Sequence, residues 1–179
     1  GDFSDWSNTF ANVDEVTPDD ATTLVSSSTL DEKDDHQIDD ASLAANDEIN
    51  VVQVGVRFRG TAASANDTFV LRLKSETGGT TDEGTATTPS DNITWDTHAD
   101  SVPRIYQLTS YDLPGASTAE WTDGTLDSAQ IGYRISANST GGVDITTAWL
   151  LVDYTLNSEL SGISAQARLE QCDEASCSW

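Results

Sequence analysis

Residues 49–59 read INVVQVGVRFR, and this stretch decides the fold because its side chains alternate between apolar and polar. Consecutive side chains of a β-strand point to opposite faces of a sheet, so this period of two predicts a strand with one buried face. The apolar face carries Val52, Val54, Val56 and Phe58, and the opposite face carries Gln53, Gly55, Arg57 and Arg59.

Four other stretches extend the pattern. Residues 68–75 (TFVLRLKS) alternate in the same way after a turn at 60–67, so the two stretches are predicted to form a hairpin. Further strands are predicted at 104–109 (RIYQLT), 130–136 (QIGYRIS) and 145–154 (ITTAWLLVDY). The last stretch is apolar on both faces, which indicates a central strand that is covered on both sides.

Helical patterns are weak throughout the chain. No segment keeps apolar spacings of three and four residues over three turns, so only a short helix at 41–48 and one turn at 117–126 are candidates. The Thr- and Gly-rich residues 77–88 are predicted to form a mobile loop.

Several short strands in a chain of 179 residues predict one all-β domain. We expect an antiparallel β-sandwich, jelly-roll-like, with N- and C-terminal extensions; a closed barrel is the alternative. The expected divisions are an acidic segment at 1–47 partly packed on the sandwich, the sandwich core at 48–156, and a C-terminal arm at 157–179. The arm is predicted to pack on a neighbouring subunit.

The charge balance excludes several partners. The chain has 31 acidic and 8 basic residues and a formal net charge of −23. Binding to a nucleic-acid backbone or to an anionic membrane surface is not expected, because no basic stripe is present. No apolar run could span a bilayer and no signal-peptide pattern is present, so we expect a soluble protein. The acidic composition is typical of halophilic proteins; an ordinary acidic secreted or virion protein is the alternative.

The acidic stretch around residues 31–40 is the candidate for a Ca²⁺ or Mg²⁺ site. Asp31, Asp34, Asp35 and Asp39 offer the oxygen ligands that Ca²⁺ prefers, but their spacing does not match an EF-hand loop. A solvated acidic loop is the favoured interpretation, and a structural cation site is the alternative. His36 and His98 lie far apart in the sequence. No cofactor is expected otherwise.

Catalytic signatures are not found. The sequence has no G-x-S-x-G elbow and no Gly-rich phosphate loop. Carboxylate pairs such as Asp112 with Glu120 are expected by chance among 31 acidic residues. We therefore predict that the protein is not an enzyme.

The aromatic residues suggest two roles. Trp95 and Tyr111 are candidates for an exposed glycan-binding platform, since flat aromatic faces stack on sugars. Trp121 and Trp149 are predicted to anchor the core.

The two cysteines of the chain, Cys172 and Cys177, lie close together in the last ten residues of the sequence. A small-loop disulfide is the favoured interpretation; an intermolecular bridge, half of a shared metal site and reduced thiols are alternatives.

The motifs between residues 49 and 154 also carry a resemblance. The order is INVVQVGVRFR, TFVLRLKS, the tetrad Ala119-Glu120-Trp121-Thr122, AQIGYRI and finally AWLLVDY. This order resembles a group of jelly-roll or β-sandwich structural proteins encoded among the virion genes of tailed phages and of archaeal tailed viruses. The residues after 157 depart from the pattern of that group.

The resemblance implies a non-enzymatic structural subunit of a virus particle, such as a head decoration, a turret or a fibre component. Such a subunit would act by assembling with itself, as a homo-oligomer such as a trimer, and with other virion proteins. The alternatives are a carbohydrate-binding or adhesive surface module and a subunit of an extracellular filament or surface layer.

Overall fold

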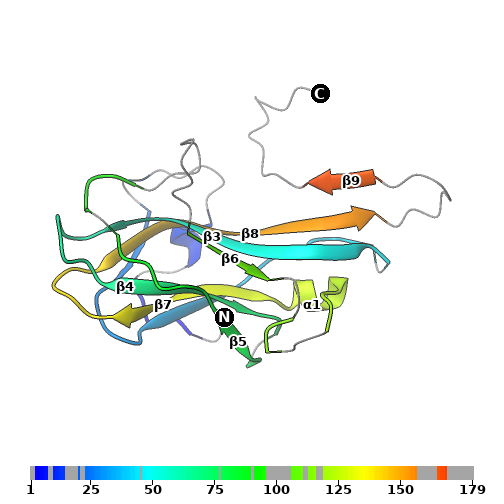
Figure 1. The fold of residues 1–179 in the computed structure, drawn as a ribbon, viewed down its shortest axis with the longest axis horizontal. Helices are drawn as coiled ribbons and strands as arrows, with labels where there is room; N and C mark the ends of the chain where they lie inside the picture. Colours follow the sequence, from blue (N-terminus) through cyan, green and yellow to red (C-terminus); the bar gives the residue numbers. More distant parts are fainter. Residues whose placement is uncertain are drawn as a thin grey trace, which may run out of the picture.

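Two antiparallel sheets pack face to face and enclose one apolar core (Figure 1). The computed structural model describes residues 3–7, 10–14, 20, 23–44, 46–76, 78–89, 91–95, 106–110, 113–115, 119–156 and 165–168. The described helical structure is limited to a 3-10 turn, Phe10–Asn12, and the short helix α1, Asp123–Asp127.

The five-stranded sheet has the order β1-β8-β3-β6, and β9 also pairs with β8. Its strands are β1 (Val25–Ser27), β8 (Val143–Leu156), β3 (Glu48–Gly60), β6 (Tyr106–Ser110) and β9 (Ala165–Arg168). The four-stranded sheet has the order β2-β7-β4-β5. Its strands are β2 (Lys33–Gln37), β7 (Gln130–Ala137), β4 (Thr68–Lys74) and β5 (Thr81–Glu83).

The pairing of the first eight strands is nested. β1 pairs with β8, β2 with β7, β3 with β6 and β4 with β5, always antiparallel. This is the connectivity of a long hairpin rolled into two sheets, joined by the β3–β8 and β4–β7 pairs. It defines a jelly roll, so the predicted antiparallel sandwich is confirmed and the closed barrel is not formed.

The alternating stretch at 49–59 forms β3 as predicted, with Val52, Val54, Val56 and Phe58 buried. Its apolar face meets the buried face of β4, where the Phe58 and Phe69 rings lie edge to face with centroids 5.0 Å apart. The predicted hairpin between these strands is wrong, because β3 and β4 belong to opposite sheets. Alternation identifies the buried face of a strand but not its hydrogen-bonded neighbour.

β8 is a central strand, as predicted, but its tryptophan is not in the core. Trp149 pairs with Gly55, and both lie on the outer face, opposite Val54 and Val56. A Cβ on Gly55 would come within 2.4 Å of the Trp149 ring, so the glycine makes room for the indole. Trp149 is half-buried, whereas Trp121 is buried in the core as predicted.

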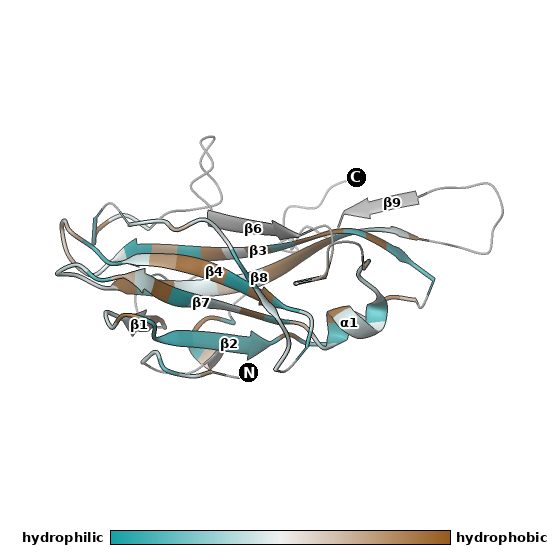
Figure 2. Ribbon diagram, turned by 60° about the horizontal axis from the view of Figure 1, so that its bottom comes forward, coloured by the Kyte–Doolittle hydropathy of each residue, from teal (hydrophilic) through white to brown (hydrophobic). Residues whose placement is uncertain are grey.

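The sandwich extends into the segment 1–47, which supplies β1 and β2. Figure 2 shows why hydropathy patterns did not predict β2, since that strand is coloured hydrophilic while β7 and β4 of the same sheet carry apolar bands. The predicted helix at 41–48 is absent from the described residues of that stretch.

Two other predictions need adjustment, whereas the packing of the C-terminal arm on a neighbouring subunit stays a prediction. The predicted loop at 77–88 contains β5, and Thr87 pairs with Phe69 of β4. The predicted turn at 117–126 overlaps α1, where Thr122 and Thr125 form a capping box. In the C-terminal arm, β9 pairs with β8 of the same chain. In the described regions, no helix is both long and apolar enough to cross a membrane.

The packing of β4 gives a first prediction. Leu71 is fully buried between the sheets, so Leu71→Ala should lower the free energy of unfolding by about 2–5 kcal/mol through lost burial and an unfilled cavity. Leu30→Ala is the control, because that side chain is 47% exposed and should change stability by less than about 0.5 kcal/mol. Denaturant titration at high salt measures both, and equal effects would contradict the assigned core.

Candidate functional site

The acidic stretch forms the edge strand of the four-stranded sheet, and it is buried. Asp34 and Asp35 are 1% and 2% exposed, so the predicted solvated loop is wrong for these residues. Asp34 and His36 pair with Tyr133 and Ile131 of β7 and therefore face the core. Asp35 pairs with Gly132 and faces outward. The charged side chains of β2 therefore lie on both faces of the sheet.

Residues 3–7, here called the Trp6 segment, cover the open edge of β2. Asp5 N donates to Lys33 O at 3.0 Å, and Asp35 N donates to Phe3 O at 3.1 Å. Ser7 N then donates to Ser26 O of β1 at 3.0 Å. The segment therefore joins the edges of both sheets and closes this side of the sandwich.

Trp6 inserts into the core and is held by polar contacts. Its main-chain N–H donates to Asp34 Oδ1 and its indole N–H donates to Glu32 O, both at 3.1 Å. Its ring lies against Tyr133, with centroids 4.5 Å apart. The Tyr133 hydroxyl is hydrogen-bonded to His36 Nε2 at 2.8 Å.

The inner polar cluster consists of Asp34, His36 and Tyr133, and burial shifts all three pKa values. Burial raises the pKa of Asp34 from 3.8 to about 6, lowers the pKa of His36 from 6.5 to about 4, and raises the pKa of Tyr133 well above 10. At neutral pH, Asp34 is therefore ionised while His36 and Tyr133 are neutral. The pKa shifts of Asp34 and His36 have opposite effects on stability. Asp34 lowers stability as the pH rises through about 6, and His36 lowers it as the pH falls from 6.5 towards 4.

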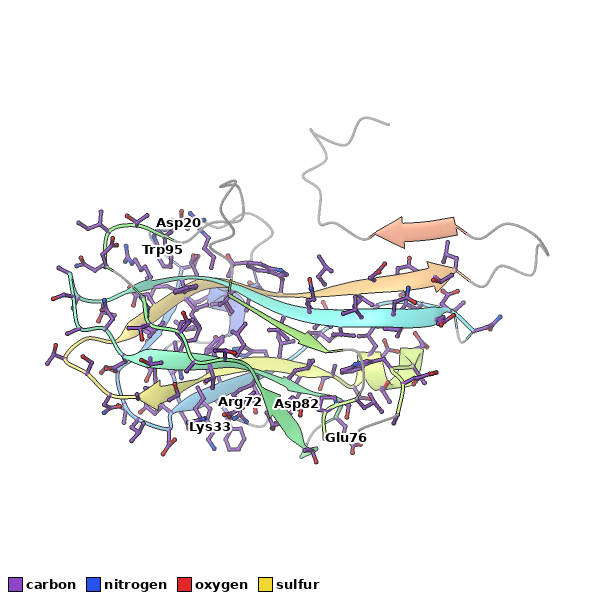
Figure 3. All side chains as sticks on the ribbon, in the orientation of Figure 1. Asp20, Lys33, Arg72, Glu76, Asp82 and Trp95 are labelled. Atoms are coloured by element: carbon purple, nitrogen blue, oxygen red, sulfur yellow. The ribbon has the colours of Figure 1, made fainter. Side chains whose placement is uncertain are left out.

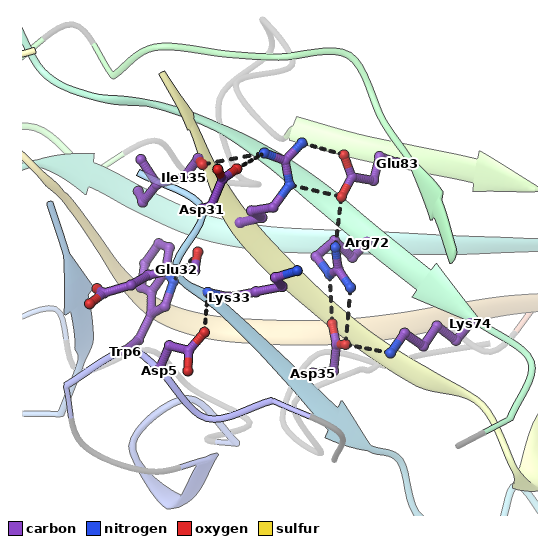
Figure 4. Close-up of polar contacts among 11 residues, drawn as sticks. Asp5, Trp6, Asp31, Glu32, Lys33, Asp35, Arg72, Lys74, Glu83 and Ile135 are labelled. Atoms are coloured by element: carbon purple, nitrogen blue, oxygen red, sulfur yellow. Dashed lines mark hydrogen bonds and ion pairs between the residues drawn. The ribbon is translucent and has the colours of Figure 1, made fainter. Parts of the chain in front are cut away.

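The outer face of the same sheet carries a continuous ion-pair network (Figure 4). Arg72 donates two hydrogen bonds to Asp35, from Nε to Oδ1 at 2.8 Å and from Nη2 to Oδ2 at 3.2 Å. Lys74 Nζ lies 2.7 Å from Asp35 Oδ2. Arg72 also donates to Glu83 Oε1 at 2.7 Å. Asp35 is thus held by two cations, and its pair with Arg72 is bidentate.

Arg134 extends the network to its exposed end. It donates to Glu83 through Nε and Nη2 at 2.9 and 2.5 Å, and to Asp31 Oδ1 through Nη1 at 2.9 Å. These Arg134 hydrogen bonds, more than the other contacts, hold the pKa of Glu83 below its usual value.

Gly132 makes the central ion pair geometrically feasible. Asp35, Gly132 and Arg72 form one cross-strand row over β2, β7 and β4. A Cβ on Gly132 would lie 2.0 Å from Asp34 O and 2.5 Å from Asp35 Oδ1. Because the middle position has no side chain, the Arg72 guanidinium reaches over β7 to the edge strand.

Phe3 covers this network from the Trp6 segment. Its ring centroid lies 4.6 Å from Lys33 Nζ, 4.8 Å from Lys74 Nζ and 5.6 Å from the Arg72 guanidinium carbon. Each contact has cation–π geometry. Figure 3 places Lys33 and Arg72 on this side of the fold. Four of the 8 basic residues of the chain, Lys33, Arg72, Lys74 and Arg134, therefore lie on one face of one sheet.

The four candidate metal ligands do not converge. Asp31 pairs with Arg134, Asp35 pairs with Arg72 and Lys74, Asp34 faces the core, and Asp39 is exposed. Within the part of the chain that the structure describes, no group of three or more His, Cys, Asp or Glu side chains could hold a metal ion. The cation-site alternative fails because strand pairing sends neighbouring aspartates to opposite faces, where arginine and lysine neutralise the outward one. His98 lies outside the described residues.

Trp95 is not an exposed platform, contrary to the sequence expectation. It is 8% exposed, its indole N–H donates to Asp20 O at 2.8 Å, and its ring stacks on Arg59 at 4.4 Å (Figure 3). Arg57 is paired in turn with Asp20, and Arg59 with Asp144. Trp95 therefore fixes residues 91–95 against β3. Tyr111, Cys172 and Cys177 lie outside the described residues.

The chemistry open to the inner cluster is limited by its enclosure. Asp34, His36 and Tyr133 are at most 7% exposed, so a substrate cannot reach them in this conformation. The cluster can take up or release a proton and can hold the Trp6 segment. Comparisons with protein-family models, with curated proteins and with solved structures find no match to this chain.

The role of Gly132 gives a second prediction. Gly132→Ala should lower the free energy of unfolding by about 1–3 kcal/mol or more, because the new methyl meets backbone and the Asp35 carboxylate. Gly124→Ala in α1 is the matched control, since a Cβ there has nothing within 4 Å, and alanine should stabilise a helix by up to about 1 kcal/mol. Thermal or denaturant unfolding compares the two. A neutral Gly132→Ala would show that the cross-strand row is not required.

Proposed function

We propose that this chain is a non-enzymatic structural subunit of a virus particle, such as a head decoration, turret or fibre component, and that it acts by oligomer assembly. The observation that carries the proposal is the jelly-roll connectivity, in which each strand pairs with its nested partner. Viral capsid domains use this architecture, as do lectin domains, so the support from the fold is an analogy.

The way in which the basic side chains are paired supports a structural role. Of the six basic side chains that the structure describes, five are in ion pairs with carboxylates, and Lys33 lies over the Phe3 ring. These cations stabilise the fold and do not line an open site. The many remaining carboxylates leave the exterior acidic, with a net charge of −23 for the chain. Two such subunits repel each other unless salt screens them, which favours a salt-rich setting.

Two features weigh against the alternatives. The burial of Trp95 removes one of the two aromatic side chains expected in a carbohydrate-binding platform, and the other, Tyr111, lies outside the described residues. A filament built by strand exchange needs a strand that pairs with another subunit, whereas β9 pairs with β8 of its own chain. Assembly through folded surfaces is therefore the function that the described residues support best.

Light scattering of the full chain across a salt series tests this function. Between about 0.1 M and 1 M KCl the Debye length falls from about 10 Å to about 3 Å, so we expect a closed oligomer at high salt and monomers at low salt. Sucrose at equal osmolality is the control, because it leaves the charges unscreened. A monomer at every salt concentration would contradict the proposal, and glycan-array binding by that monomer would favour an adhesive module.

A further inference from the structure

We propose that the Trp6 segment is a proton-sensitive latch, docked most tightly across the β1/β2 edge when Asp34 is protonated and more weakly when Asp34 is ionised. This inference depends on the described fold and does not require the proposed assembly. It assigns a role to Asp34, a buried carboxylate that is not part of the outer ion-pair network.

Asp34 lies directly beneath the segment. Ser4 pairs with Asp34 across the strand edge, and Trp6 N donates to Asp34 Oδ1. The other carboxylate oxygen, Oδ2, is buried and accepts no hydrogen bond in the described structure. β2 is otherwise the edge strand of its sheet, so release of residues 3–7 would return the carboxylate to water. Docking therefore desolvates Asp34 and satisfies only one of its oxygens.

Among the residues that the structure describes, no lysine or arginine pairs with Asp34. Arg72 and Lys74 lie on the opposite face of the sheet, where they bind Asp35. His36 Nε2 is 3.9 Å from Asp34 Oδ2, but burial keeps this imidazole neutral above about pH 4. The titratable and charged groups around Asp34 are Asp5 on the segment, Lys33, Asp35 and His36 on β2, and Tyr133 on β7. The carboxylates of Asp5 and Asp35 both disfavour a further negative charge at Asp34.

The sign of the effect follows from proton linkage. The pKa of Asp34 is about 6 in the docked state, against an ordinary value of 3.8, so the docked state binds the proton more tightly. Docking is therefore strongest below pH 4 and weakens as the pH rises through about 6. A difference of about two pKa units limits the change in the docking equilibrium to about a hundredfold.

His36 acts in the opposite direction on global stability, because burial lowers the pKa of its imidazole. Phe3 pairs with Asp35, whereas His36 pairs with Ile131 on the other side of β2 and is hydrogen-bonded to Tyr133. Release of residues 3–7 therefore uncovers Asp34 first. A His36→Gln variant separates the two groups experimentally.

Hydrogen exchange of the Trp6 amide in the full chain tests the latch. Exchange is measured from about pH 4.5 to 7.5 and corrected for intrinsic rates, and the Leu71 amide in β4 reports global opening. We expect the protection factor of Trp6, relative to Leu71, to fall by about ten- to a hundredfold, mostly between about pH 4.5 and 6, and to level off above about pH 6. Asp34→Asn keeps the acceptor oxygen without the titration, so its relative protection should not vary with pH.

Two further variants serve as controls. Asp31→Asn removes a carboxylate that is 69% exposed on the other face of the sheet, and His36→Gln removes the imidazole; both should retain the Trp6 transition. A flat wild-type profile would overturn the proposal. So would a transition that survives in Asp34→Asn or that disappears in His36→Gln.

Discussion

The bidentate ion pair between Asp35 and Arg72 fixes the position of the edge strand on which this side of the fold depends. The pair crosses Gly132, and its partners lie 37 residues apart in the sequence. Loss of both cations would leave Asp35 buried and unpaired at a large cost in stability, so the ion pairs favour the register of β2 that brings Asp35 to Arg72 and Lys74. That register also turns Asp34 and His36 towards the core. The Trp6 segment then pairs with β2 and closes the sandwich.

The distribution of charge links this edge to the composition of the chain. With 8 basic residues against 31 acidic ones, the protein has half of its cations on the outer face of the four-stranded sheet. There they neutralise Asp31, Asp35 and Glu83 beneath the Phe3 ring. The remaining described cations, Arg57 and Arg59, hold Asp20 and Asp144 on the other sheet. Because the cations are paired within the fold, the charges on the exterior are mostly carboxylates. This is consistent with a subunit that assembles at high salt concentration.

The sequence predicted the strands that bury apolar side chains, since alternation identifies β3, β4 and β7, and a doubly apolar run identifies β8. It did not predict β2, because an inward aspartate and histidine look hydrophilic in any pattern of hydropathy. The groups that contact the buried residues of β2 come from β4, β7 and the Trp6 segment. Such contacts between distant parts of the chain cannot be read from local sequence spacing. The burial of Trp95 was missed for the same reason, since Asp20 and Arg59 are distant in sequence. One signal was available: Arg72, Lys74 and Arg134 occupy the outward positions of predicted strands in a chain with very few cations.

A double-mutant cycle between Asp35 and Arg72 tests the central claim most directly. The free energy of unfolding is measured at high salt for the wild type, Asp35→Asn, Arg72→Gln and the double variant. If the pair holds β2 in register, each single change should be strongly destabilising and the coupling energy should reach about 2 kcal/mol or more, because both side chains are buried. A coupling energy below about 0.5 kcal/mol, the size expected of an exposed surface pair, would contradict the account.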